Sequence, residues 1–145
     1  MTDKPLIGHI ESLNLPQLNI KNLPVRVDTG AKTSSLHVDD IRQQVIDGKP
    51  HVKFKIHPEL HDISNTIECC APIHDIRRVK SSNGQSEQRY VIESRAELGT
   101  TDWDIEITLT DRSEMTYLML LGRQAIAGNF YVDPSRSFIQ SGDDG

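Results

Sequence analysis

Apolar and polar residues alternate along most of this chain, which is the pattern of strands with one buried face. The clearest case is residues 104–110, where Ile105, Ile107 and Leu109 alternate with polar residues. Turn-forming residues interrupt such runs roughly every 8–12 residues, as they do in sandwiches and barrels. The pattern therefore predicts an all-β fold with very little helix.

The alternating runs place candidate strands between clear turns. They cover residues 6–11, 20–28, 36–38, 42–46, 51–56, 73–80, 88–94, 104–110, 115–121, 130–132 and 137–139. Hairpin turns are expected at Asp47-Gly48 and Asn83-Gly84, because glycine accepts positive φ. Residues 13–18 should be loop and residues 57–70 irregular, whereas the last two strands should form a hairpin around residues 133–136.

One short helix is expected near the end of the chain. Residues 115–121 are apolar enough for a strand buried on both faces, and Gly122 ends this run. Residues 123–127 can form one or two helical turns before Gly128 stops them. The length of 145 residues fits a single domain, 1–145, with a disordered tail at about 141–145.

Composition and charge exclude several classes of function. The net charge of −5 argues against binding to nucleic acid through its phosphates. The one basic cluster, residues 77–80, fits a strand face or loop better than a nucleic-acid patch. The first residues lack the apolar segment of a signal peptide, and no run reaches the length of a membrane span. Adjacent Cys69 and Cys70 cannot easily bridge each other, so we expect a cytoplasmic protein with reduced thiols.

The stretch Arg26-Val27-Asp28-Thr29-Gly30-Ala31 carries the strongest chemical signal. A strand that ends on a carboxylate and then breaks at glycine presents one acid at a defined point. Acid–base chemistry on an unactivated water usually needs two carboxylates, one ionised and one protonated. A chain with one such motif would take the second acid from another copy of itself, which predicts a homodimer.

Two separated motifs resemble those of retropepsin-like aspartic peptidases. Residues 25–31 resemble their catalytic strand and turn, and Leu120-Leu121-Gly122-Arg123 resembles their second signature. Over nearly its full length, the chain is similar to the bacterial family named for ATP-dependent zinc proteases. Residues 27–37, 106–113, 119–123 and 132–134 carry that similarity. The resemblance implies a retropepsin-like closed barrel, with the short helix after Arg123.

The resemblance also implies a chemistry. Asp28 and its copy in a second subunit would hold a water and share one proton. Thr29 would lock the two turns together through its hydroxyl, and Gly30 would let the backbone approach the substrate. Because the family is associated with ATP-grasp glutamate ligases that modify ribosomal protein, the implied substrates are glutamate-modified proteins. The alternative for Asp28 is a turn in which its carboxylate caps local N–H groups.

Lys32 departs from the family pattern. Many retroviral enzymes carry an acid at this position, and that acid pairs with the arginine that corresponds to Arg123. Arg123 therefore needs another partner here. A cation so close to the acids can lower their pKa values or receive an acidic side chain of the substrate. We hypothesise a preference for Glu- or Asp-containing peptides, with Ala31, Lys32, Asn83 and Gly84 as substrate contacts and a solvated surface lysine as the alternative.

Two hairpins are candidates for a flap that closes over the substrate. Residues 79–90 form the first, with Asn83-Gly84 at its tip, and the turn at Asp47-Gly48 forms the second. A flap excludes water only if it projects over the site. Otherwise each hairpin is an ordinary surface turn.

Some residues suggest metal or nucleotide chemistry, but their spacing does not support it. Zinc-ligand types occur at His57, His61, Cys69, Cys70 and His74. However, the chain lacks a His-Glu-x-x-His motif, and its cysteines are adjacent rather than spaced as Cys-x-x-Cys. No phosphate-binding glycine loop occurs either. We therefore expect no metal and no cofactor, with a zinc-dependent protease kept as one alternative.

Two further alternatives concern the residues that follow Asp28. Ser34, Ser35 and His37 suggest a serine hydrolase, but the Gly-x-Ser-x-Gly elbow is absent, so turn and strand roles fit better. A barrel that binds peptides without cutting them is the remaining alternative.

Overall fold

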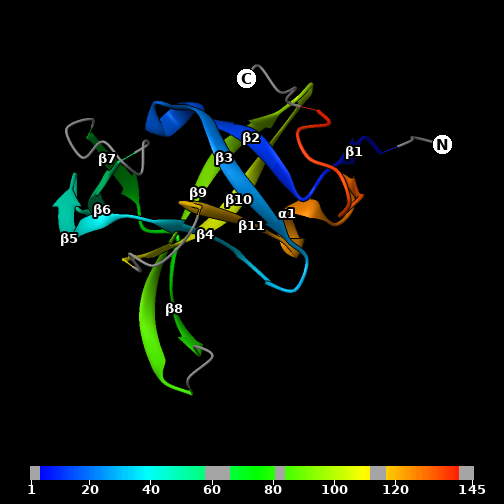
Figure 1. The fold of residues 1–145 in the computed structure, drawn as a ribbon. Helices are drawn as coiled ribbons and strands as arrows, with labels where there is room; N and C mark the ends of the chain where they lie inside the picture. The colour runs from blue at the N-terminus through cyan, green and yellow to red at the C-terminus, as the bar shows by residue number, and fades with distance from the viewer. Residues whose placement is uncertain (1–3, 58–65, 81–83, 112–116, 141–145) are drawn as a thin grey trace.

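The computed structural model describes residues 4–57, 66–80, 84–111 and 117–140. Most of this part of the chain is β-strand (Figure 1). The strands are β1 (Leu6–Ile7), β2 (Ile10–Leu15), β3 (Ile20–Asp28), β4 (Ser34–His37), β5 (Asp39–Ile46), β6 (Lys49–Ile56), β7 (Ile67–Pro72), β8 (Asp75–Lys80), β9 (Ser86–Leu98), β10 (Thr101–Thr110), β11 (Met119–Gly122) and β12 (Tyr131–Val132). The helices are a short 3₁₀ helix, η1 (Pro16–Leu18), and one α-helix turn, α1 (Arg123–Ile126).

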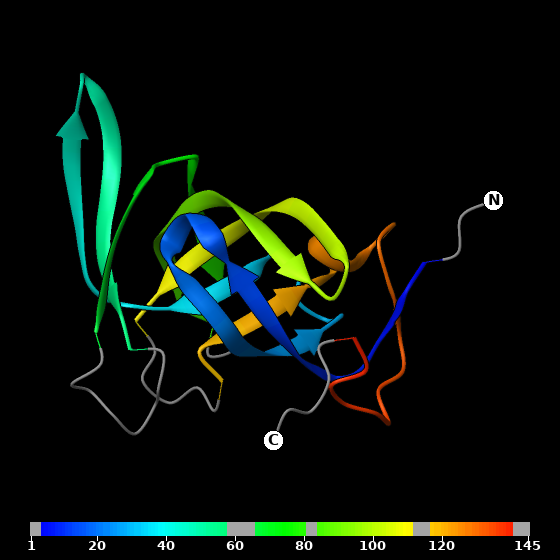
Figure 2. The same ribbon diagram turned by 90° about the horizontal axis from the view of Figure 1, so that it is seen from above.

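Six strands follow one another in a ring. The main sheet has the order β10-β4-β11-β3-β2-β9-β8, and β9 also pairs with β10, which brings the order back to its start (Figure 2). β2 and β9 share the shortest pairing in the ring, which consists of Asn14 opposite Glu97. The predicted all-β, retropepsin-like fold is confirmed, and so is the short helix after Gly122.

The core is aliphatic, as the scarcity of aromatic residues requires. Leu13, Leu36 and Ile107 are completely buried in it. Burial of such side chains stabilises a fold by about 1.5–3 kcal/mol each. The indole of Trp103 packs edge-on against Phe130, with ring centroids 5.1 Å apart, and so attaches the end of the chain to β10.

β11 lies between β3 and β4 and determines the shape of the site. It runs parallel to β3, with Gly122 opposite Asp28, and antiparallel to β4, with Met119 opposite Leu36. Met119 and Leu121 are buried, as predicted for this strand, but Leu120 is only half-buried because it faces a pocket. One turn joins β3 to β4, and β11 pairs with both of these strands, so β11 holds the turn in place.

A second, three-stranded sheet has the order β5-β6-β7 and extends from the main sheet (Figure 1). The predicted turn between β5 and β6 is confirmed, with positive φ at both Asp47 (52°) and Gly48 (77°). β7 was not expected, because residues 57–70 looked irregular. Its inward positions are Ile67, Cys69 and Ala71, and the small side chains weakened the apolar signal.

The ends of the chain differ from the prediction. The expected strand over residues 6–11 is divided at Gly8, because residues 136–137 cross there: a Cβ on Gly8 would lie 2.3 Å from the Arg136 carbonyl oxygen. The expected terminal hairpin is wrong, since β12 pairs in parallel with β1 and residues 137–139 are not strand. The expected loop over residues 13–18 is also wrong, because β2 continues to Leu15 and η1 follows.

A buried carboxylate explains the path of the C-terminal segment. Glu11 is completely buried and accepts hydrogen bonds from the backbone N–H groups of Gly8 (2.8 Å), Ile139 (2.8 Å) and Gln140 (3.2 Å). These bonds satisfy amide groups that would otherwise need a ladder partner. Residues 139–140 therefore bind to a side chain instead of forming a strand.

The long hairpin of β8 and β9 projects from the main sheet (Figure 1). β9 is longer than the predicted strand over residues 88–94, because it continues to Leu98 and turns at Gly99 (φ 63°) into β10. The predicted tail over 141–145 and part of the predicted strand over 115–121 lie outside the described residues. Among the described residues, no helix is long and apolar enough to cross a bilayer.

Candidate active site

Asp28 ends β3 at the start of a tight turn. Its Oδ1 accepts a hydrogen bond from the Gly30 N–H at 3.0 Å, and its carbonyl accepts one from the Ala31 N–H at 3.2 Å. The carboxylate therefore caps the turn, as one reading of the sequence expected. Its other oxygen, Oδ2, has no partner among the described residues. Asp28 is half-buried, so this oxygen is held in place and remains available.

Gly122 packs directly against the strand that follows the turn. A Cβ at this position would lie 2.6 Å from the Thr33 carbonyl carbon and 2.8 Å from the Ser34 nitrogen. The Gly122 N–H donates to Ser34 Oγ at 3.0 Å. Ser34 is buried and its hydroxyl is used for this contact, so it has a structural role and is not placed as a nucleophile.

The start of α1 holds the turn from the other side. The N–H groups of Arg123 and Gln124 donate to the carbonyls of Ala31 (2.8 Å) and Lys32 (3.1 Å). The Arg123 guanidinium donates to the Gly30 carbonyl at 3.2 Å. This is the other partner that Arg123 needed once lysine replaced the usual acid at position 32. The second signature thus braces the turn through backbone groups rather than an ion pair.

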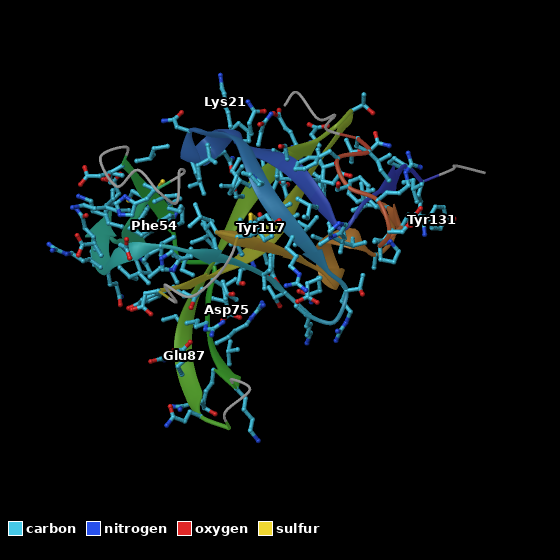
Figure 3. The ribbon with its side chains drawn as sticks, in the orientation of Figure 1. Lys21, Phe54, Asp75, Glu87, Tyr117 and Tyr131 are labelled. Atoms are coloured by element: carbon cyan, nitrogen blue, oxygen red, sulfur yellow. The ribbon has the colours of Figure 1, made fainter. Side chains whose placement is uncertain are left out.

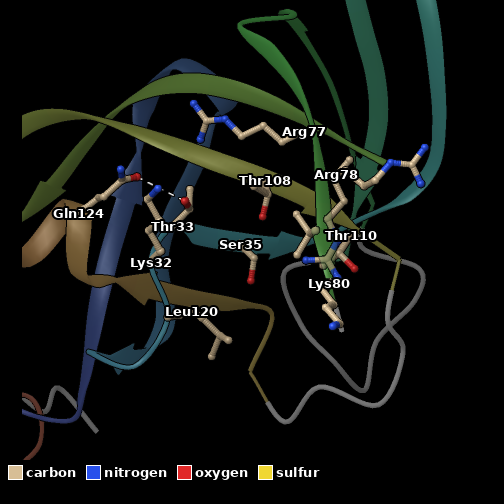
Figure 4. A pocket seen from close by; sticks show the side chains of 13 residues that line it. Lys32, Thr33, Ser35, Arg77, Arg78, Lys80, Thr108, Thr110, Leu120 and Gln124 are labelled. Atoms are coloured by element: carbon tan, nitrogen blue, oxygen red, sulfur yellow. Dashed lines mark hydrogen bonds between the residues drawn. The ribbon is translucent and has the colours of Figure 1, made fainter. Parts of the chain in front are cut away.

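A pocket of about 800 Å³ lies beside the turn (Figure 4). Its lining comes from the turn, β4, β8, β9, β10, β11 and α1. The residues are Ala31, Lys32, Thr33, Ser35, Arg77, Arg78, Val79, Lys80, Arg89, Thr108, Thr110, Leu120 and Gln124. Ala31 and Lys32 were expected as substrate contacts, and Val79, Lys80 and Arg89 belong to the hairpin proposed as a flap. The β4 and β10 positions were not expected.

The hairpin of β8 and β9 flanks this pocket, and the hairpin at Asp47-Gly48 contributes no lining residue from the described part of the chain. Of the two flap candidates, the geometry favours the first. Gly84 has a φ of 86° and is exposed, away from the lining. Asn83 lies outside the described residues.

The positive charges of the pocket fall into two groups. Arg77 binds both oxygens of Glu106 at 3.0 Å and Asp75 at 2.7 Å, and Arg89 binds Glu87. The guanidinium of Arg77 lowers the pKa of Glu106 and of Asp75. The second group consists of Lys32, Arg78 and Lys80, for which no carboxylate partner is found in the described ranges.

The candidate zinc ligands among the described residues do not form one cluster. The His57 Nε2 atom lies 2.9 Å from Asp39, whereas the His74 Nε2 atom lies 3.0 Å from Glu106. Burial, assisted by the neighbouring thiol of Cys70, raises the pKa of Cys69 to about 11. In the part of the chain that the structure describes, no three histidine, cysteine or acidic side chains come together as metal ligands. His61 lies outside that part.

Comparison with known proteins identifies the family. The RimB-like family, described as the retropepsin-like aspartic endopeptidase RimB, matches residues 6–143. The chain belongs to this family. It is also similar to a crystal structure of a Legionella pneumophila protein of unknown function, with 28% identity, 95% of this chain and 99% of that chain covered, and a TM-score of 0.79.

Curated relatives of this RimB-like chain carry a different name. A probable alpha-L-glutamate ligase of Shewanella pealeana is 44% identical over 94% of this chain, and one of Parasynechococcus marenigrum is 42% identical over 94%. The chain spans only about 30% of the length of these relatives. The matched region is therefore one part of larger proteins that are named as ligases.

Proposed function

We propose that this chain is an aspartic endopeptidase whose active form is a homodimer with one Asp28 from each subunit. One observation carries the proposal: the Gly30 N–H fixes one oxygen of Asp28 and leaves the other available, in a turn braced by Gly122 and Arg123. Membership of a family described as aspartic endopeptidases supports the same chemistry.

The mechanism follows from two carboxylates in contact, which share one proton because both cannot ionise cheaply. The ionised carboxylate takes a proton from the bound water as the water oxygen attacks the carbonyl carbon. The protonated carboxylate gives its proton to the carbonyl oxygen, which produces a gem-diol. A proton then passes from the gem-diol through a carboxylate to the amide nitrogen. The C–N bond breaks and leaves an acid and an amine.

Acidic, glutamate-modified proteins are the proposed substrates. The pocket cations for which the described ranges offer no carboxylate partner favour ligands of negative charge. Relatives named as glutamate ligases contain a region similar to this chain, which supports a link to glutamate addition. The role proposed for Lys32 is to receive an acidic side chain near the cleaved bond.

The test compares wild type with Asp28→Asn on a glutamylated peptide and the same peptide without glutamate, each with and without a chelator. Wild type should cleave the glutamylated peptide, and Asp28→Asn should lower turnover by about 10²–10⁴-fold, since it removes the acid–base group. Chelation should change nothing. Loss of activity with chelator would replace the proposal by a metal enzyme. Binding without cleavage by wild type would leave a peptide-binding module.

A further inference from the structure

The pocket cations that have no carboxylate partner among the described residues lie at two separate ends of the pocket. Figure 4 shows Lys32 with Thr33 and Gln124 at one end, and Arg78 with Lys80 and Thr110 at the other. We infer that the pocket reads two acidic side chains of one substrate at the same time, one at Lys32 and one at Arg78 and Lys80. This inference rests on the proposed function and assigns its specificity to particular residues.

Lys32 is placed by the turn itself. Its carbonyl accepts a hydrogen bond from the Gln124 N–H at 3.1 Å, so its backbone is held by α1, while its side chain is exposed. It stands four positions after Asp28 along the chain. Because the Ala31 N–H donates to the Asp28 carbonyl at 3.2 Å, Lys32 directly follows the closed turn. We therefore assign an acidic side chain bound here to a substrate residue close to the attacked bond.

Arg78 and Lys80 belong to the projecting hairpin. They alternate along β8 and are both exposed, so they point to the same side of the strand. Their neighbour Arg77 is already neutralised by Glu106 and Asp75. Arg78 and Lys80, which have no carboxylate partner among the residues that the structure describes, therefore provide the charge that would bind a ligand at this end.

Within the described part of the chain, none of the 13 residues that line the pocket is aspartate or glutamate, so no acidic lining residue competes for these cations there. Instead the lining offers the hydroxyl group of Ser35 and the apolar side chain of Leu120, while the buried hydroxyl of Thr108 donates to the Ser34 carbonyl at 3.2 Å. A ligand with one carboxylate would leave one end unpaired. A ligand with two acidic residues pairs both ends across a neutral floor.

Four peptides test this inference: one with both glutamates, two with one of them replaced by glutamine, and one with both replaced. Their Kd values are measured on Asp28→Asn protein by fluorescence anisotropy, so cleavage is not needed for the readout. The variants, added to Asp28→Asn, are Lys32→Met and the pair Arg78→Met with Lys80→Met. Lys21→Met is the matched control, because Figure 3 places Lys21 at the opposite end of the molecule from the β8 and β9 hairpin.

Each end should discriminate one glutamate. Lys32→Met should weaken binding of the doubly acidic peptide by about two- to fivefold. This loss should disappear for the peptide in which the glutamate closer to the cleaved bond is replaced by glutamine. The pair Arg78→Met with Lys80→Met should show the same pattern for the other glutamate. Added salt should reduce both effects, and the control should change none.

Two results would overturn the inference. In the first, each cation variant weakens binding of both singly acidic peptides equally. In the second, the Asp28→Asn protein with its lysines and arginines unchanged binds all four peptides with the same Kd. Failure of the proposed cleavage would look different. Wild type would then leave every peptide intact, while the position-dependent losses of binding would persist.

Discussion

At position 122, any side chain larger than hydrogen collides with backbone. A Cβ there would come within 2.6 Å of the Thr33 carbonyl carbon, which belongs to the segment after the Asp28 turn. Backbone atoms cannot move aside as a flexible side chain can, so a Cβ at position 122 would displace the backbone of the Asp28 turn. Glycine at this place is thus a condition for the position of Asp28.

We predict that Gly122→Ala lowers the free energy of unfolding by about 1–3 kcal/mol, as overpacking does, and displaces the turn. Urea unfolding measures the first effect and peptide turnover the second. Ala127→Ser is the control, because this exposed residue follows α1 and surface changes stay within about 0.5 kcal/mol. Full stability and turnover in Gly122→Ala would contradict the close packing described for β11.

The buried carboxylate of Glu11 gives a second prediction. Glu11→Gln puts an amide NH₂ where backbone N–H groups now donate to carboxylate oxygens, so at least one buried donor loses its acceptor. We expect a loss of about 1–3 kcal/mol in thermal unfolding. Glu93→Gln, at an exposed position of β9, should be neutral. Equal melting temperatures for the two variants would show that Glu11 does not hold the C-terminal segment.

At the residue scale, the sequence alone predicted those parts of the candidate site that consist of contiguous motifs. The Asp28 turn and the Gly-Arg signature are contiguous motifs, and both could be found by inspection. Arg78 and Lys80 were interpreted as part of a strand face or loop, but their place on the same pocket as Lys32 depends on where the β8 and β9 hairpin lies in the fold. The pocket was missed because contacts between distant segments leave no local pattern.

At the scale of elements, the projecting hairpin is tied to the main sheet by a charge network. Arg77 on β8 binds Glu106 on β10 through two hydrogen bonds of 3.0 Å, and His74 lies 3.0 Å from the same carboxylate. The Arg77 guanidinium, assisted by His74, lowers the pKa of Glu106 below its usual 4.5. The network therefore stabilises the fold above pH 4.5 and is lost as the pH falls through the lowered pKa.

Glu106→Gln should accordingly lower the melting temperature at pH 7 and have a shrinking effect as the pH falls below 4.5, because the wild-type carboxylate becomes protonated there. Thermal unfolding between pH 7 and pH 3 measures this convergence. Glu68→Gln on the second sheet serves as the control. A difference that stays constant down to pH 3 would mean that Arg77 does not stabilise this charge.

The strands show which signals a sequence preserves. β3 and β10 were predicted because their alternation is strong and their ends carry turn residues. β7 was missed because cysteine and alanine occupy two of its inward positions. The pairing of β12 with β1 could not be predicted, since it joins the two ends of the chain and depends on the path that Glu11 imposes.

At the scale of the whole molecule, the proposed dyad needs two chains. Mixing wild type with an equal amount of Asp28→Asn, after subunit exchange, should leave about one quarter of the activity of wild type at the same total protein concentration, because random pairing gives that share of intact dyads. Chains that worked alone would leave one half. Activity per chain should also fall on dilution. Analytical ultracentrifugation measures dissociation of the dimer over the same concentrations, and the two curves should coincide.

The position of β11 between β3 and β4 has a consequence during synthesis of the protein on the ribosome. The turn that carries Asp28 is complete only when Gly122, 94 residues later, reaches it. A ribosome adds about 5–20 residues per second, so the acid waits on the order of 5–20 seconds for its support. During that interval the Asp28 turn of a nascent chain lacks the bracing that Gly122 and Arg123 give it in the folded protein.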